Sequence, residues 1–215
     1  MGPIVVATGN PHKVEELRAI LGPLDIELLS LSEAGDTGPE PDEPGSTFEE
    51  NAALKALAYA ERTGRLCLAD DSGLEVDALA GAPGVISARY HSDGRETDLP
   101  RAERDRLNNE RLLNELEGVP TARRTARFVC AMALAHPARK ALVCVRGAFE
   151  GRIGLPGQVP RGSNGFGYDP LFLVAPDFNR TSAELSPHEK NRVSHRGNAA
   201  RALAAAISEL LRSGA

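Results

Sequence analysis

Two adjacent carboxylates, Asp70 and Asp71, are the residues of this sequence best suited to metal-dependent chemistry. They follow the apolar run at 66–69 and precede Ser72 and Gly73. The run predicts a buried strand, and the polar residues after it predict a turn at the carboxyl end of that strand. Neighbouring carboxylates repel one another, and Mg²⁺ is the simplest counter-charge because it prefers hard oxygen ligands. A turn without chemistry is the alternative, since Asp, Ser and Gly also form turns for local reasons.

A second polar segment follows the β-branched run at 4–7 and is suited to binding phosphate. It comprises Thr8, Gly9, Asn10, Pro11, His12 and Lys13. Asn10 suits the N-cap of a helix, and Pro11 suits its first position. The free N–H groups at such a helix start attract anions, and Lys13 adds a formal positive charge. The segment lacks the longer glycine loop of a Walker A motif, so a capped helix without a ligand is the alternative.

The segment at 165–169 places two aromatic residues beside glycines, in a chain that has only 6 Phe and 3 Tyr. Glycines allow the backbone to approach a flat ligand on which Phe166 can stack, while Asp169 can accept a hydrogen bond. A turn whose aromatic residues belong to the core is the alternative. A later basic cluster comprises Lys190, Arg192, His195 and Arg196. A solvated helix face is the alternative for this cluster.

The pattern of apolar residues predicts the elements that position these groups. In the first part of the chain they are strands at 4–7, 26–30 and 66–69, a helix at 11–21, and a second helix that ends at Gly64. Two overlapping capping boxes precede the second helix, Ser46 with Glu49 and Thr47 with Glu50. Strand, helix and strand form a parallel crossover unit, so the phosphate segment and the two acids are expected at the same edge of the sheet.

The rest of the chain predicts a charged helix, a hairpin and two further helices. The expected elements are a helix from about 100 to 116, strands at 125–135, 141–153 and 171–174, and helices starting at 186 and 198. The hairpin makes the predicted sheet mixed. At roughly 3.6 residues per turn, His195 lies about 140° around a helix from Lys190, so both reach one ligand only if the helix bends or ends near Gly197.

Composition restricts the classes of function. The chain has 215 residues and a net charge of −5, which is too acidic for a broad nucleic-acid footprint. Three cysteines, Cys67, Cys130 and Cys144, lie in apolar runs without metal-ligand spacing, so we expect reduced core residues. Residues 1–4 carry no basic leader, and no window reaches the roughly 18 apolar residues of a membrane span. We therefore expect a cytoplasmic protein without a membrane segment.

Six motifs together strongly resemble the inosine triphosphate pyrophosphatase family, the housecleaning dITP/XTP pyrophosphatases. The motifs are TGNPHK at 8–13, TFEENAALKA at 47–56, ADDSGL at 69–74, GVISARY at 84–90, GFGYDP at 165–170 and SHRG at 194–197. They follow the order of the family over about 4–211. The resemblance implies a single domain at 1–215 with a mixed α/β fold: a twisted central sheet flanked by helices, in two lobes with the active-site cleft between them. It also implies a homodimer.

The implied reaction is Mg²⁺-dependent hydrolysis of ITP, dITP and XTP to a nucleoside monophosphate and pyrophosphate, which removes deaminated purines from the nucleotide pool. By resemblance, Asp71 looks like the catalytic acid and a metal ligand, with Asp70 supporting the metal and Ser72 beside the substrate. Of the two acids in the preceding loop, Asp42 and Glu43, we expect Glu43 to be the metal partner. The residues that look like the substrate pocket are Thr8 to Lys13 for the triphosphate, and Phe166, Gly167, Tyr168, Asp169, Lys190, His195 and Arg196 for the nucleoside.

This interpretation gives a chemical sequence. Mg²⁺ on Asp71 and Glu43 would activate water, Asp71 or Asp70 would take its proton, and Lys13 would stabilise the departing pyrophosphate. Donors from Arg196 or His195 would pair with a 6-oxo group and would stay unpaired against adenine. The rejection of guanine does not follow from these residues.

Two other functions are compatible with parts of the sequence. A Maf-like nucleotide pyrophosphatase would have a related fold and different bases as substrates, but the motifs at 165–170 and 194–197 disfavour it. A nucleotide-sensing module without turnover would be expected to lack an acid of the metal site, yet Asp70, Asp71 and Glu43 are all present.

Overall fold

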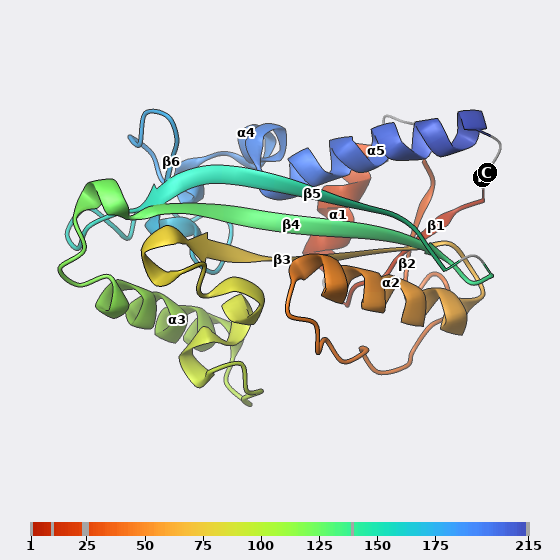
Figure 1. The fold of residues 1–215 in the computed structure, drawn as a ribbon, viewed down its shortest axis with the longest axis horizontal. Helices are drawn as coiled ribbons and strands as arrows, with labels where there is room; N and C mark the ends of the chain where they lie inside the picture. Colours follow the sequence, from red (N-terminus) through yellow and green to blue (C-terminus); the bar gives the residue numbers. More distant parts are fainter. Residues whose placement is uncertain (1, 10, 23–25, 139, 214–215) are drawn as a thin grey trace. The chain divides into compact units, whose positions relative to one another are not determined.

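The computed structural model describes residues 2–9, 11–22, 26–138 and 140–213. In this part of the chain a six-stranded sheet has the order β2-β1-β3-β4-β5-β6, with helices packed against it (Figure 1). The strands are β1 (Ile4–Val6), β2 (Leu28–Ser30), β3 (Cys67–Val76), β4 (Thr125–His136), β5 (Lys140–Ile153) and β6 (Phe172–Val174). The α-helices are α1 (Pro11–Leu21), α2 (Phe48–Thr63), α3 (Arg101–Glu115), α4 (Pro187–Val193) and α5 (His195–Ser213).

The sheet is mixed, which confirms the predicted fold class. β1 pairs in parallel with both β2 and β3, whereas β5 and β6 are antiparallel. β4 and β5 are neighbours joined only by residues 137–139, and a connection this short joins antiparallel strands. The predicted hairpin is therefore present.

The chain divides into two compact units, each with its own core. Unit 1 comprises Met1–Ser72, Cys130–Gly147 and His195–Ala215, and unit 2 comprises Gly73–Val129 and Ala148–Ser194. The core of unit 1 includes Leu17, Leu68, Met132 and Leu203. The core of unit 2 includes Leu74, Leu112, Phe128, Phe149 and Phe172. These cores bury the apolar residues that the sequence pattern marked as strand and helix faces.

The sequence predicts that this strand ends at the two acids, but β3 continues through them to Val76. Leu74 and Val76 are fully buried in the core of unit 2, and their burial extends the strand past residues that locally favour a turn. Gly73 serves a close approach, because a Cβ there would lie 2.4 Å from Ser87 Oγ. The hydroxyl of Ser87 in turn accepts a hydrogen bond from Leu74 N at 2.9 Å.

Two of the helix starts follow from the sequence, and one does not. Thr47 caps α2 in a capping box with Glu50, and Ser186 caps α4 in the same way. The last helix begins at His195 rather than 198, because Ser194 adopts an extended conformation (ψ 157°) that separates α4 from α5.

Cys67 and Cys130 are buried as expected, but Cys144 is exposed, which corrects its assignment to the core. Cys144 belongs to β5, where the alternation of a strand turns every second side chain away from the core. Within the described ranges, no helix combines the length and apolar character that crossing a membrane requires.

Candidate active site

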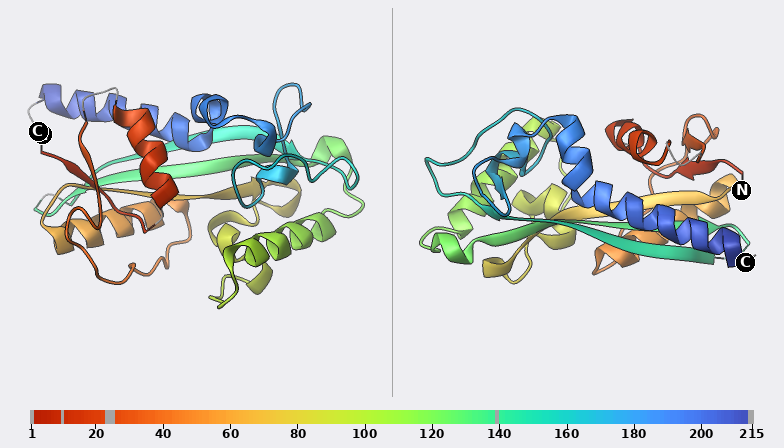
Figure 2. Two further views of the ribbon diagram at one scale, coloured as in Figure 1. Left: turned by 180° about the vertical axis from the view of Figure 1, so that it is seen from behind. Right: turned by 90° about the horizontal axis from the view of Figure 1, so that it is seen from above.

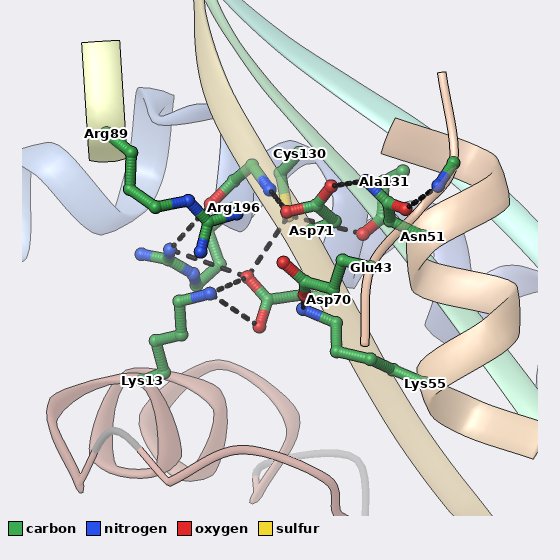
Figure 3. A network of polar contacts seen from close by, with 12 residues as sticks. Lys13, Glu43, Asn51, Lys55, Asp70, Asp71, Arg89, Cys130, Ala131 and Arg196 are labelled. Carbon is green, nitrogen blue, oxygen red and sulfur yellow. Dashed lines mark hydrogen bonds and ion pairs between the residues drawn. The ribbon is translucent and has the colours of Figure 1, made fainter. Parts of the chain in front are cut away.

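In unit 1, Asp70 lies in the middle of β3 with two basic side chains on its carboxylate (Figure 3). Lys13 Nζ donates to Oδ1 at 3.1 Å and lies 2.9 Å from Oδ2, while Arg196 Nη2 lies 3.5 Å from Oδ2. Burial alone would raise the pKa of Asp70, but the charges of Lys13 and Arg196 outweigh it and hold the pKa well below its ordinary value. Asp70 is therefore a permanent anion that holds two cations in place.

Asp71 has neutral hydrogen-bond donors instead. Asn51 Nδ2 donates to its Oδ2 at 3.1 Å, and Ser72 N donates to its Oδ1 at 2.9 Å. Burial raises the pKa of Asp71 above its ordinary value; the charge of Lys55 offsets this only in part, and the charge of Glu43 adds to it. A carboxylate with a raised pKa is better matched to accepting a proton near neutral pH than one with a lowered pKa.

The geometry of the strand separates the two acids. Successive side chains of a strand point to opposite faces of the sheet, and in unit 1 the helices α1 and α2 lie on opposite sides of the strands (Figure 2). Asp70 and Ser72 both contact Arg196, which lies 3.5 Å and 3.4 Å away, whereas Asp71 contacts Asn51 of α2. Their mutual repulsion is thus reduced by the strand itself, and relieving it does not require a metal.

Two functional candidates on α2, Asn51 and Lys55, were not assigned roles from the sequence. Lys55 is buried and forms an ion pair with Glu43. Burial would lower the pKa of Lys55, but the charges of Asp70, Glu43 and Asp71 outweigh it and raise the pKa. The sequence contains one indication of a role for them: these two polar residues are four positions apart in an alanine-rich helix, which places both on one buried face.

Arg196 owes its place to the start of α5. It is buried, forms an ion pair with Glu16, and its Nη2 lies 3.4 Å from Ser72 Oγ. β5 approaches this helix start so closely that a Cβ at Gly147 would lie 2.3 Å from both His195 O and Ala199 N. Arg196 therefore lies among the residues around Asp70, and His195 is buried beside it in the chain.

The predicted phosphate segment is described only in part. Thr8 and Gly9 follow β1, and a Cβ at Gly9 would meet no heavy atom of the described residues within 4 Å. Asn10 lies outside the described residues, as do the side chains of Pro11 and His12, so their contacts with phosphate remain predictions. Lys13 is the member of the segment whose position is clear, because it is fixed against Asp70.

The possible metal ligands at and around Asp71 fit a weakly held Mg²⁺ better than a permanently bound metal ion. The described part of the chain contains no group of three or more His, Cys, Asp or Glu side chains arranged to hold a metal. Mg²⁺ is commonly held by one or two carboxylates and takes its other ligands from phosphates and water. Glu43 and Asp71 provide two hard carboxylate donors around the buried ammonium of Lys55. This set fits an ion that arrives with a phosphate substrate, whereas Asp70 is already engaged by Lys13 and Arg196.

In unit 2, Asp169 shapes the loop at 165–169, which we call the aromatic loop. Its carboxylate accepts hydrogen bonds from Phe166 N at 2.9 Å, Ser182 Oγ at 2.7 Å and Lys190 Nζ at 2.6 Å. Gly165 is required beside it, since its φ is +79° and a Cβ would lie 2.0 Å from Asp169 Oδ2. Asp169 therefore shapes the loop, in addition to any contact with a ligand.

The two aromatic residues of this loop differ in exposure. Phe166 is 39% exposed, whereas Tyr168 is buried and its hydroxyl donates to Ser87 O at 2.8 Å. Burial raises the pKa of Tyr168, so its phenol remains protonated and serves as a donor. An exposed ring beside a buried anchor is the arrangement that stacking on a flat ligand needs.

The predicted pocket residues are thus divided between the units. Phe166, Gly167, Tyr168, Asp169 and Lys190 belong to unit 2, while the described phosphate segment, Ser72, His195 and Arg196 belong to unit 1.

Comparison with known proteins identifies the family. The Ham1 family profile matches residues 4–206. A relative from Exiguobacterium sibiricum, named dITP/XTP pyrophosphatase, is 50% identical over 208 residues, which cover 97% of this chain and 98% of the relative. A relative of the same name from Nitratidesulfovibrio vulgaris is 53% identical over 200 residues, or 93% of each chain.

Solved structures agree with these matches. The structure of a HAM1 protein from Coxiella burnetii superposes with a TM-score of 0.82 at 40% identity, covering 97% of this chain and 100% of that one. A dITP/XTP pyrophosphatase structure from Mycobacterium abscessus has a TM-score of 0.71 at 45% identity, covering 95% of this chain and 98% of that one. Because the family profile and these relatives all match nearly the whole chain, it belongs to the Ham1 family.

Proposed function

We propose that this chain is a nucleoside triphosphate pyrophosphatase that hydrolyses dITP and XTP, and also ITP, to the nucleoside monophosphate and pyrophosphate. The observation that carries the proposal is the contrast between two neighbouring acids. Asp70 is a fixed anion holding Lys13 and Arg196, and Asp71 is a carboxylate of raised pKa. A fixed cationic group next to a proton acceptor is what hydrolysis of a phosphoanhydride needs. The names of the closely similar relatives support the choice of substrate.

In the proposed reaction, a water oxygen bonds to the α-phosphorus while one of its protons passes to Asp71. The bond from the α-phosphorus to the bridging oxygen breaks, and pyrophosphate leaves with the electron pair. Lys13 stabilises the charge on that leaving group. Asn51 and the Ser72 amide keep the carboxylate of Asp71 in one orientation.

Dependence on Mg²⁺ is part of the proposal. Asp71 and Glu43 would hold the ion, and the ion would supply neutralisation of phosphate charge and a lowered pKa of bound water. In this scheme Asp70 supports the site through Lys13 and Arg196 rather than by direct ligation.

The nucleoside end of the substrate is assigned to Phe166, which would stack on the base, with Lys190 and Asp169 beside it. His195 and Arg196 remain candidates for donors to a 6-oxo group. Removal of deaminated purines from the nucleotide pool, a homodimer and a cytoplasmic location also remain predictions.

An assay of pyrophosphate release tests this function. We expect Mg²⁺-dependent release from dITP, XTP and ITP, and much less from dGTP or a pyrimidine triphosphate. Preference for a pyrimidine triphosphate would favour a Maf-like enzyme, and tight nucleotide binding without release would favour a sensing module. No release from dITP, XTP or ITP with Mg²⁺ present would contradict the proposal.

Asp71→Asn tests the role of the proton acceptor. We expect kcat to fall by about 10²–10⁴-fold because the amide cannot take the proton. The fold should persist, since the amide oxygen can still accept from Asn51 or Ser72. In the unmodified chain without Mg²⁺ or nucleotide, Asp71 should titrate above 3.8, the ordinary pKa of an aspartate, because burial raises its pKa. Asp177→Asn, at an exposed position, is the matched control. An unchanged kcat in the Asp71 variant would remove it from this role.

A further inference from the structure

One face of α3 holds the aromatic loop through hydrogen bonds to both the backbone N–H and the backbone C=O of one residue, Gly167. Asp105 Oδ2 accepts a hydrogen bond from Gly167 N at 3.0 Å, and Asn109 Nδ2 donates to Gly167 O at 3.1 Å. Asp105 and Asn109 are four residues apart in α3, so their side chains lie on the same face. All of these residues belong to unit 2. Gly167 immediately follows Phe166, so this grip acts next to the exposed ring.

The same face also reaches the ring itself. The guanidinium carbon of Arg101 lies 4.2 Å from the centroid of Phe166, and Arg101 Nε lies 3.9 Å from Asp105 Oδ2. Arg101 precedes Asp105 by four residues, which adds a third member to the face. Asp105 therefore contacts both the backbone beside the ring and the cation that covers it.

The internal bonds of the loop do not replace this attachment. Asp169 binds Phe166 N three residues earlier, which gives the turn its shape. Tyr168, which follows Gly167 in the chain, is anchored by the hydrogen bond from its hydroxyl to Ser87 O. Gly167 has a φ of +60°, a backbone conformation that favours glycine. Because glycine has no side chain, only its N–H and C=O groups can attach it to the rest of unit 2.

The side-chain oxygen of Asn109 lies in an unfavourable environment. Its Oδ1 is buried and accepts no hydrogen bond from any residue that the structure describes. A buried acceptor without a partner destabilises a fold. The amide nitrogen of Asn109 donates to Gly167 O, so the side chain holds the loop although its buried oxygen costs stability.

We propose that the α3 face formed by Arg101, Asp105 and Asn109 positions the Phe166 ring for stacking on the base of the substrate. The inference rests on the function proposed above. Asp105 is the central member because it contacts Gly167 and Arg101 together. These residues touch the loop and not the reacting atoms, so they are positioning residues.

The first experiment reads the ring position without turnover. The chain contains no tryptophan, so Phe166→Trp introduces a single indole at the ring position. Adding Asp105→Ala should shift its emission and increase its quenching by acrylamide, while Asp105→Asn, which keeps an acceptor, should restore the original values. Glu110→Ala is the matched control, because Glu110 lies on α3 with its side chain 55% exposed. Identical spectra for Asp105→Ala and its parent would overturn the inference, whether or not the chain hydrolyses XTP.

The second experiment separates base recognition from chemistry. In the otherwise unmodified chain, Asp105→Ala should raise KM for XTP about tenfold with little change in kcat, the effect expected from losing a charge-assisted hydrogen bond. Inhibition by inorganic tripolyphosphate, which has no base, should be unchanged. Equal weakening of XTP and tripolyphosphate, or an unchanged KM, would contradict the proposal.

Asn109→Leu keeps the test decisive if Asp105→Ala does not fold. Leucine removes the buried unpaired acceptor together with the bond to Gly167, so the melting temperature should stay level or rise while KM for XTP rises. A purely structural role predicts the opposite, a lower melting temperature with unchanged KM. Absence of XTP hydrolysis in the unmodified chain would instead count against the proposed function. In that case the fluorescence experiment would still test whether the α3 face positions the ring.

Discussion

Asp70 and Asp71 are chemically identical side chains whose surroundings give them opposite proton affinities. Asp70 is surrounded by Lys13, Arg196 and Lys55, which lower its pKa despite burial. Asp71 is buried with amide donors and the nearby charge of Glu43, which leaves its pKa raised. Pairs of acids whose pKa values are separated in this way are commonly divided between a fixed charge and a proton-transfer group.

The ion pairs of Asp70 predict a specific dependence of stability on pH. A carboxyl whose pKa is lower in the folded state stabilises the fold above its unfolded pKa, and this stabilisation is lost as pH falls toward the folded value. We therefore expect Asp70→Asn to be clearly less stable than the unmodified chain near pH 7. The difference should shrink below about pH 3.8, the ordinary value. Urea unfolding at several pH values measures it.

The result for Asp70 is interpretable only against a comparable exposed ion pair. Asp93→Asn is the control, because Asp93 pairs with Arg111 at the surface of unit 2 and its side chain is 68% exposed. Exposed pairs contribute little to stability, so this variant should change little. A pH-independent loss for Asp70→Asn would mean that the ion pairs with Lys13 and Arg196 do not carry the effect.

At the scale of elements, the start of α5 depends on a glycine in a neighbouring strand. Gly147 of β5 lets the first turn of this helix approach so closely that no Cβ fits, and that turn carries Arg196. A glycine with this role is invisible in the sequence, because it contributes no chemistry and no pattern of its own.

Gly147→Ala should therefore displace the start of α5. We expect a loss of about 1–3 kcal/mol in unfolding free energy, as for other overpacked sites, together with reduced activity through the shift of Arg196. Gly22→Ala is the control, since a Cβ there meets no atom within 4 Å in the part of the chain that the structure describes. Chemical denaturation and pyrophosphate release measure the two effects. Full stability of the Gly147→Ala variant would contradict the close approach.

Elements whose signals are local were predictable from the sequence, and those set by distant contacts were not. The caps of α2 and α4 depend on residues three apart and could be predicted with their partners, Thr47 with Glu50 and Ser186 with Glu189. The passage of β3 through Asp70 to Val76 depends on burial against residues far along the chain. For the same reason, the partners of Arg196 were not predictable, since Asp70 lies 126 positions away in the sequence.

At the scale of the whole chain, residues of one type are divided between core and site. Phe172 is fully buried in unit 2, with ring centroids 4.7 Å from Phe128 and 5.3 Å from Phe149. Phe166 of the same unit is 39% exposed. Composition alone does not separate these two rings, and motif resemblance singled out only Phe166.

Phe172→Ala and Phe166→Ala should give opposite results. The first is expected to lower unfolding free energy by about 3–5 kcal/mol because it opens a cavity in the core. The second should leave stability nearly unchanged and raise KM for the nucleotide. Urea unfolding followed by circular dichroism, with kinetics on the folded fractions, makes the comparison. Similar losses of stability in both variants would contradict this division.

The uneven burial of the three thiols has a practical consequence for labelling. Cys67 and Cys130 are buried, and burial raises the pKa of both, so neither offers an accessible thiolate. Cys144 alone of the three is exposed on β5. A maleimide dye will therefore attach at one defined position of the natural sequence, with no cysteine to be replaced. Labelling will proceed best at mildly alkaline pH, because partial desolvation of the thiol and the charge of Glu49 raise the pKa of Cys144 as well.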